Sequence, residues 1–288
     1  MRFIRKLTLL ITVSALLVLN SCEKDSSTPL IPAYIEVNQF NLTTSGSQGT
    51  NSHQITDAWI FVNDQLEGIF ELPARVPTLL TGEQNVKIFA GIKNNGIGSE
   101  RVRYPFYTNY DMNMTLEPDS TYVINPDITY VSTATIWEED FEDGGIAFTK
   151  TALSDTNFVQ DNTDPFEGSK SGVVTFDVGD LYFESRTNEP TFDNFPKVGL
   201  PVYVELNYKS NIQFSVGILH NDGSLPSDVK TGVFTFNTQA GWNKTYIQLS
   251  DAVSQQPAAT TFDLYFDAVN DGTSASPKIE MDNIKVVF

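Results

Sequence analysis

Residues 202–209 read Val-Tyr-Val-Glu-Leu-Asn-Tyr-Lys, and their alternation decides the fold class. Side chains of an extended strand point to opposite faces in turn, so Val202, Val204, Leu206 and Tyr208 share one face. Similar short runs recur along the chain, broken by Gly, Asn, Asp and Pro, and none after residue 22 follows the period of a helix. Aromatic residues, which favour strands, make up 12 % of the chain. The sequence predicts an all-β protein.

The composition excludes several classes of function. The 288 residues include 36 acidic and 18 basic side chains, a net charge of −18, whereas nucleic-acid binding needs a basic surface. One cysteine, Cys22, excludes an intrachain disulfide or a cysteine-based zinc site. The two histidines, His53 and His220, fit no metal spacing, and no nucleophile elbow or phosphate loop is present. We expect no nucleic-acid partner.

The first 33 residues predict export and lipidation. Three basic residues precede the apolar stretch 7–19, which is shorter than the ~20 residues of a membrane span and fits a signal peptide. Residues 19–22, Leu-Asn-Ser-Cys, resemble the lipobox of bacterial lipoproteins. The resemblance implies a signal peptide over 1–21, a lipid on Cys22 and a lipidated tether over 22–33, so that acyl chains hold the protein at the membrane. The alternative is a plain thiol after an ordinary signal peptide.

The residues after Cys22 bear on location. Glu23-Lys24-Asp25 is similar to the export signals of surface-exposed lipoproteins in some Gram-negative groups. We therefore expect an outer-membrane, lipid-anchored protein exposed at the cell surface, with retention on the periplasmic leaflet as the alternative.

Residues 34–133 form the first predicted domain. Residues 58–68 predict a strand, an Asn-Asp turn and a second strand, and 79–90 predict a turn into a strand. The pattern resembles Ig-like or transthyretin-like β-sandwich modules of the PEGA kind, which implies a spacer or an interaction domain. The aromatic segment Tyr104–Tyr110 has two interpretations, a plug packed over the end of the sandwich or an exposed edge for a partner.

Residues 136–288 form the second predicted domain. Its markers are Phe-Glu-Asp-Gly at 141–144, Gly-Ser-Lys-Ser-Gly at 168–172, Gly-Trp-Asn-Lys at 241–244 and Asp-Asn-Ile at 282–284. Their order resembles the galactose-binding-like jelly-roll β-sandwich of many carbohydrate-binding modules, which implies a non-catalytic domain. Trp242, within the third marker, is interpreted as a core residue, with a stacking platform for sugar as the alternative.

The same resemblance implies a structural calcium ion, because the first and last strands of such jelly rolls are neighbours. The residues that would hold it are Asp140, Glu142, Glu167 and Asp282. Carboxylate oxygens are the ligands that Ca²⁺ prefers. The alternative is a solvated acidic strand end.

Glu138-x-Asp140-x-Glu142 also matches the catalytic strand of laminarinase-like glycoside hydrolases, in which three carboxylates line one strand face. Only about 150 residues follow this motif, fewer than that fold needs. Glu139 also stands where an apolar residue is required. We predict a non-enzyme and retain the hydrolase as an alternative.

Strand parity outlines a glycan-binding face. The polar side of three predicted strands carries Tyr203, Glu205, Asn207, Tyr246, Gln248, Asp263, Tyr265 and Asp267. Tyrosine rings stack on the C–H face of a pyranose, while carboxylates and amides bind its hydroxyls. The alternative is an ordinary β surface. The sequence thus predicts a surface lipoprotein that binds glycan, or else a structural or assembly lipoprotein that docks a protein partner.

Overall fold

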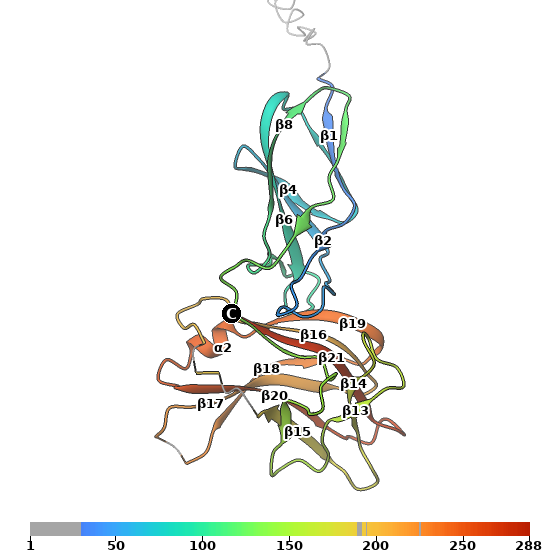
Figure 1. The fold of residues 1–288 in the computed structure, drawn as a ribbon, viewed down its shortest axis with the longest axis vertical. Helices are drawn as coiled ribbons and strands as arrows, with labels where there is room; N and C mark the ends of the chain where they lie inside the picture. The colour runs from blue at the N-terminus through green and yellow to red at the C-terminus, as the bar shows by residue number, and fades with distance from the viewer. Residues whose placement is uncertain (1–29, 189–191, 194, 225) are drawn as a thin grey trace, which may run out of the picture.

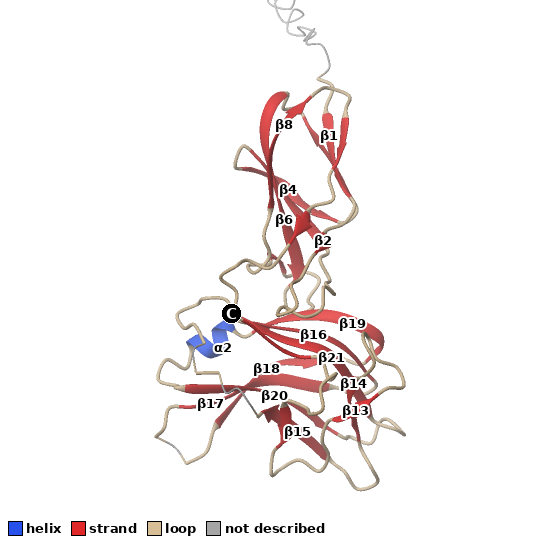
Figure 2. Ribbon diagram, in the orientation of Figure 1, coloured by secondary structure: helices blue, strands red, loops and turns tan. Residues whose placement is uncertain are grey.

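The computed structural model describes residues 30–288 except 189–191, 194 and 225, and it confirms an all-β protein (Figures 1 and 2). The predicted signal peptide and Cys22 lie outside the described residues. Within the described ranges, no helix is long and apolar enough to cross a membrane.

The N-terminal sandwich comprises two main sheets. One has the order β5-β1-β9, and the other has the order β4-β3-β6-β7, with β8 also paired to β6. The short strands β2 and β10 pair with each other. The bounds are β1 Ala33–Val37, β2 Asn41–Leu42, β3 Asp57–Val62, β4 Gln65–Glu71, β5 Ala74–Thr78, β6 Gly82–Lys93, β7 Arg101–Arg103, β8 Tyr110–Leu116, β9 Thr121–Val123 and β10 Asp127–Ile128.

The C-terminal sandwich also has two sheets. The first has the order β13-β14-β21-β16-β19, with β11 paired to β21, and the second has the order β12-β15-β20-β17-β18. The bounds are β11 Ile136–Glu139, β12 Phe148–Lys150, β13 Val159–Asp161, β14 Ser171–Thr175, β15 Tyr182–Thr187, β16 Tyr203–Ser210, β17 Phe214–Asn221, β18 Val229–Phe236, β19 Gln239–Gln248, α2 Ser250–Ser254, β20 Thr261–Val269 and β21 Lys278–Val287.

Local sequence explains the predicted hairpin at 58–68. Strands β3 and β4 pair in antiparallel register around Asn63 and Asp64. Both turn residues have a positive φ, of 50° and 63°, which Asn and Asp tolerate better than other side chains. Ala58, Ile60 and Val62 point inward and are fully buried.

The two sandwiches share buried surface. The buried residues in the core of the C-terminal sandwich all follow residue 140, and Trp137 packs against them. The core of the N-terminal sandwich, however, includes Tyr203, Tyr246 and Val287 from the other sandwich. Figure 1 shows the reason, since β16 and β19 lie on the side of the C-terminal sandwich that faces the N-terminal one. The description of the two parts as Ig-like and as a jelly roll stays a prediction.

Candidate functional site

The outer face of β16 and β19 is not available as the glycan-binding face that the sequence predicted. Parity is as expected, because Val204, Leu206 and Ile247 lie in the core and Tyr203, Glu205, Asn207 and Tyr246 point outward. The N-terminal sandwich covers this outer face, and the exposed fractions are 3 % for Tyr203, 0 % for Glu205 and Asn207, and 1 % for Tyr246. Gln248 is half-buried and accepts a bond from Asn94 at 3.2 Å. These residues form an interface within the chain.

A hydrogen-bonded cluster lies at the centre of that interface. The Tyr104 hydroxyl donates to Glu205 Oε1 at 2.6 Å, and the Tyr130 hydroxyl donates to the same oxygen at 2.9 Å. Lys244 Nζ lies 3.3 Å from Glu205 Oε2. Burial and the adjacent carboxylate raise the pKa of Tyr104 well above its ordinary value, so it stays a donor. Both carboxylate oxygens of Glu205 therefore have polar partners within the interface.

The aromatic segment 104–110 supplies part of this cluster. Tyr104, Phe106 and Tyr107 are 3–6 % exposed, and the hydroxyls of Tyr107 and Tyr246 lie 3.2 Å apart. The segment fills the junction between the sandwiches. The interpretation of these three residues as an exposed partner edge is therefore wrong.

The remaining predicted residues lie on a different sheet, away from the N-terminal sandwich. On β20, Phe262, Leu264 and Phe266 point into the core, so Asp263, Tyr265 and Asp267 belong to the outer face. The ring of Tyr265 lies over two glycines that face each other on neighbouring strands, Gly217 of β17 and Gly232 of β18. A side chain at Gly217 would occupy the space of the ring, whereas one at Gly232 would make an ordinary contact with the hydroxyl. The predicted face is therefore divided between two sheets.

An ion network surrounds Tyr265. Lys230 Nζ lies 4.5 Å from the centroid of its ring and binds Glu184 at 2.5 Å, Asp267 at 2.6 Å and the Tyr182 hydroxyl at 2.8 Å. Burial alone would lower the pKa of Lys230, but these bonds outweigh burial and raise it. The side chain of Lys230 is 35 % exposed and that of Asp267 is 20 % exposed, whereas Tyr265 is 1 % exposed. Lys230 thus stands between the ring and solvent.

The outer face continues on both sides of the network. Arg186 forms ion pairs with Asp228 and Asp263. A pocket of about 250 Å³ adjoins Asp267 and is lined also by Gln213, Ser215, Thr235 and Asp271. Tyr182, Glu184, Arg186 and Lys230 were not predicted from the sequence. The signal that could have found them is the alternation of Tyr182, Glu184 and Arg186 along one strand, with Phe183 buried between them.

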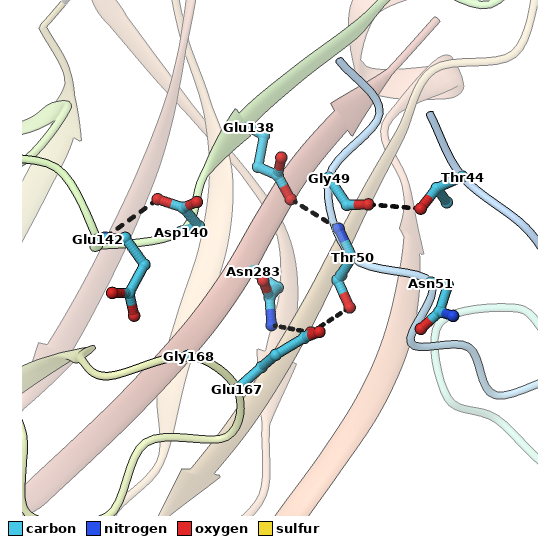
Figure 3. A pocket seen from close by; sticks show the side chains of 10 residues that line it. All are labelled: Thr44, Gly49, Thr50, Asn51, Glu138, Asp140, Glu142, Glu167, Gly168 and Asn283. Carbon is cyan, nitrogen blue, oxygen red and sulfur yellow. Dashed lines mark hydrogen bonds between the residues drawn. The ribbon is translucent and has the colours of Figure 1, made fainter. Parts of the chain in front are cut away.

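A second polar pocket, of about 420 Å³, lies where the two sandwiches meet (Figure 3). Three predicted calcium ligands, Asp140, Glu142 and Glu167, line it together with Glu138, and Thr50 and Asn51 line it from the N-terminal sandwich. The fourth predicted ligand, Asp282, is not among the lining residues. The structure therefore brings three of the four predicted carboxylates to one pocket.

The carboxylates of this pocket are occupied by protein hydrogen bonds. Glu142 accepts bonds from the Ser169 amide at 2.7 Å, the Ser169 hydroxyl at 2.5 Å and the Lys170 amide at 2.8 Å, and these bonds lower its pKa. Glu167 accepts from Thr50 and from Asn283 (Figure 3). Among the residues that the structure describes, no three Asp, Glu, His or Cys side chains are placed to hold a metal ion. The calcium site stays a prediction.

Asp282 anchors the loop that carries Glu167. Its carboxylate accepts the amides of Phe166 at 3.0 Å, Glu167 at 3.2 Å and Asn283 at 2.8 Å. Burial raises the pKa of Asp282 to about 7, although these amides act in the opposite direction. The residue holds one wall of the pocket in place.

One alternative and one expectation from the sequence need correction. Strand β11 ends at Glu139 and Phe141 has a φ of 60°, so Glu138, Asp140 and Glu142 do not line one strand face as the hydrolase motif requires.

Trp242 is not a core residue. It lies half-buried beside Phe166, with ring centroids 5.8 Å apart, and Lys209 Nζ lies 4.9 Å from its ring.

No family model matches the chain, and no curated protein matches it. About half of the chain resembles solved carbohydrate-binding modules. The xylan-binding CBM22-1 domain of Paenibacillus barcinonensis Xyn10C is 13 % identical, with a TM-score of 0.41, and the likeness covers 54 % of this chain and 96 % of that one. A point mutant of a family 29 carbohydrate-binding module, CBM29-2, is 11 % identical, with a TM-score of 0.35, over 54 % of this chain and 92 % of that one. Because these values are low, we base the proposals on this chain's own residues.

Proposed function

We propose that this chain is a lipid-anchored, surface-exposed, non-catalytic protein that binds glycan through the outer face of β15, β20, β17 and β18. One observation carries the proposal: two tyrosines, Tyr182 and Tyr265, lie among carboxylates and a lysine on a sheet face that the N-terminal sandwich leaves uncovered. Rings supply stacking surface for a pyranose, and the charged groups bind its hydroxyls.

The position of Lys230 suggests how a sugar would enter the site. The ammonium group covers the ring of Tyr265 and is held by Glu184 and Asp267. A sugar that stacks on Tyr265 must displace Lys230, and the released ammonium group and carboxylates can then bind the hydroxyls of the ligand. The adjoining pocket at Ser215 and Thr235 offers further hydroxyl groups for a second sugar unit.

A glycan array with the chain from residue 23 onward tests this proposal. Tyr182→Ala should weaken binding of the best glycan about tenfold, since loss of one stacking ring is worth about 1–1.5 kcal/mol. Tyr34→Ala, in the N-terminal sandwich, is the matched control and should bind normally. If no glycan binds, or if both variants weaken equally, the proposal fails and the alternative of a protein-docking lipoprotein gains support.

The lipid anchor is part of the proposal and has its own test. Cells that express the wild-type chain should incorporate labelled palmitate into it, and Cys22→Ala should abolish the label. Added protease should then remove the protein from intact cells if it stands at the surface. Protection from the protease would place it on the periplasmic leaflet instead.

A further inference from the structure

Positive charge gathers on one face of the N-terminal sandwich. Four of the five basic residues between positions 34 and 133 lie on β6 and β7, namely Lys87, Lys93, Arg101 and Arg103. Ile88, Ala90 and Ile92 point into the core, so Lys87 and Lys93 point outward, and Arg101 pairs with Lys93 in the register. This stripe stands out in a chain of net charge −18.

Three aromatic rings lie on the same outer face. Trp59 and Phe61 belong to β3, where Ala58, Ile60 and Val62 are the inward residues. Trp59 faces Phe89 of β6 across the register, and the rings of Phe61 and Phe89 meet edge to face at 5.5 Å. All three rings are half-buried, and Ile69 beside Trp59 is 42 % exposed. The rings and the basic stripe form one surface.

Arg103 joins these two features. Its guanidinium carbon lies 4.9 Å from the centroid of Phe89, 5.7 Å from that of Phe61 and 5.8 Å from that of Trp59. A guanidinium that lies beside rings keeps its N–H groups available for a carboxylate. Within the described part of the chain neither Arg103 nor Lys93 forms an ion pair, whereas Arg101 pairs with Asp57 and Lys87 pairs with Asp64.

The topology decides which anionic ligand suits this surface. The rings lie on β3 and β6, and both edges of each strand are already paired within the sheet. A peptide therefore cannot add to these strands through its main chain. A polysaccharide needs no main-chain pairing, since its C–H faces stack on rings and its carboxylates bind cations.

We propose that the surface formed by Trp59, Phe61, Phe89, Lys93 and Arg103 binds a carboxylated polysaccharide. The proposal is independent of the C-terminal glycan face, because it uses other residues on the other sandwich. It assigns the N-terminal sandwich a binding role in addition to that of a spacer.

Affinity electrophoresis of the chain from residue 23 onward tests the proposal at about 0.15 M salt, where charges further apart than about 8 Å are screened. The probes are polygalacturonate, the same polymer with its carboxylates methyl-esterified, and poly-L-glutamate. Arg103→Ala should weaken binding to polygalacturonate about tenfold through loss of one charge-assisted contact. Arg103→Lys should keep part of the binding.

Arg75→Ala is the matched control, because Arg75 also stacks on a ring, that of Tyr34 at 3.4 Å, on the other sheet of the same sandwich. It should bind as the wild type does, and Tyr182→Ala should also leave polygalacturonate binding intact. Equal loss in Arg75→Ala and Arg103→Ala, or equal binding of the methyl ester, would overturn the proposal. Arg103-dependent binding of poly-L-glutamate alone would identify an acidic peptide as the ligand and overturn it too.

Discussion

At the residue scale, Gly217 leaves room for the ring of Tyr265 because glycine has no side chain. A Cβ built on Gly217 would lie 2.6 Å from Tyr265 Cε1 and would also clash with the main-chain oxygen of Thr231. Gly217→Ala should therefore lower the free energy of unfolding by about 1–3 kcal/mol, the usual cost of overpacking. Urea denaturation measures this change.

Gly232 provides the control for that substitution. A Cβ there would lie 3.5 Å from the Tyr265 hydroxyl, which is an ordinary contact. Gly232→Ala should change stability by clearly less than Gly217→Ala. Equal effects would mean that the cost arises from glycine's main-chain freedom and not from the position of the ring.

Lys285 should make the stability of the folded chain depend on pH. Its ammonium donates to the main-chain oxygens of Gln48 and Thr50, and burial lowers its pKa from 10.5 to about 8. Between pH 8 and 10.5 the unfolded chain binds more protons at this site than the folded chain, so the contribution of Lys285 to stability rises with pH. Below pH 8 both states are protonated and this contribution is constant.

The measurement compares the wild type with Lys285→Met in urea at several pH values from about 7 up to the onset of tyrosine ionisation near pH ~10. The wild type should gain stability relative to the variant as pH rises through 8. If the difference in stability between the two proteins does not change with pH, the pKa of Lys285 is the same in the folded and the unfolded chain, and the prediction is wrong.

At the element scale, the contact of segment 104–110 with β16 depends on Glu205. Tyr104→Phe removes a hydrogen bond to a buried carboxylate, and such a bond is worth about 1.5–3 kcal/mol. Thermal or urea unfolding should show this loss. Tyr122→Phe is the control, because its hydroxyl accepts a bond from the Glu117 amide at an exposed site. A similar loss of stability in both variants would show that the bond to Glu205 contributes no more than an exposed hydrogen bond.

The loop between β13 and β14 is where the calcium prediction can be tested. Glu167 lies in it, and Asp282 and Glu142 hold it from neighbouring segments. A cation bound only by the folded state raises Tm, so excess EDTA should lower Tm in the wild type but not in Glu142→Gln. A wild-type melting curve unchanged by EDTA would refute the prediction.

The sequence could predict faces but not what covers them. The alternation over 202–209 correctly separates Val204 and Leu206 from Glu205 and Asn207, because parity is a local property. Tyrosines beside a glutamate suit a sugar site and a buried interface equally well. The partner that decides between them, Tyr104, is 101 residues away in the chain, and no local pattern records that contact.

Strands β5 and β7 are among those that escaped prediction, as did one backbone turn. Strand β7 has three residues, too few for a periodic pattern, and β5 contains Pro77, which usually argues against a strand. The positive φ of Phe141 turns the backbone, so Glu142 does not continue the face of β11 that carries Glu138, yet phenylalanine carries no signal for that conformation. The polar residues were therefore assigned to one strand face that the backbone does not form.

At the scale of the whole molecule, the shared core predicts cooperative unfolding. Multidomain proteins commonly unfold in several steps. Here Tyr203, Tyr246 and Val287 complete the core of the N-terminal sandwich. Calorimetry of the chain from residue 23 onward should show one transition with equal calorimetric and van't Hoff enthalpies. Two separated transitions would contradict a shared core.

The connection between the sandwiches determines how the molecule would bear mechanical load. The described chain begins at the end of the N-terminal sandwich farthest from the C-terminal one (Figure 1). Thr135 and Phe288 exchange main-chain hydrogen bonds of 2.7 and 3.0 Å, and β11 continues that pairing along β21. A pull between the N-terminus and a ligand on the distal sheet would therefore reach the C-terminal sandwich through its first and last strands, and also through the buried interface around Glu205. For a molecule that is anchored and binds glycan as proposed, the pairing of β11 with β21 and the buried contacts of Glu205 would share that load.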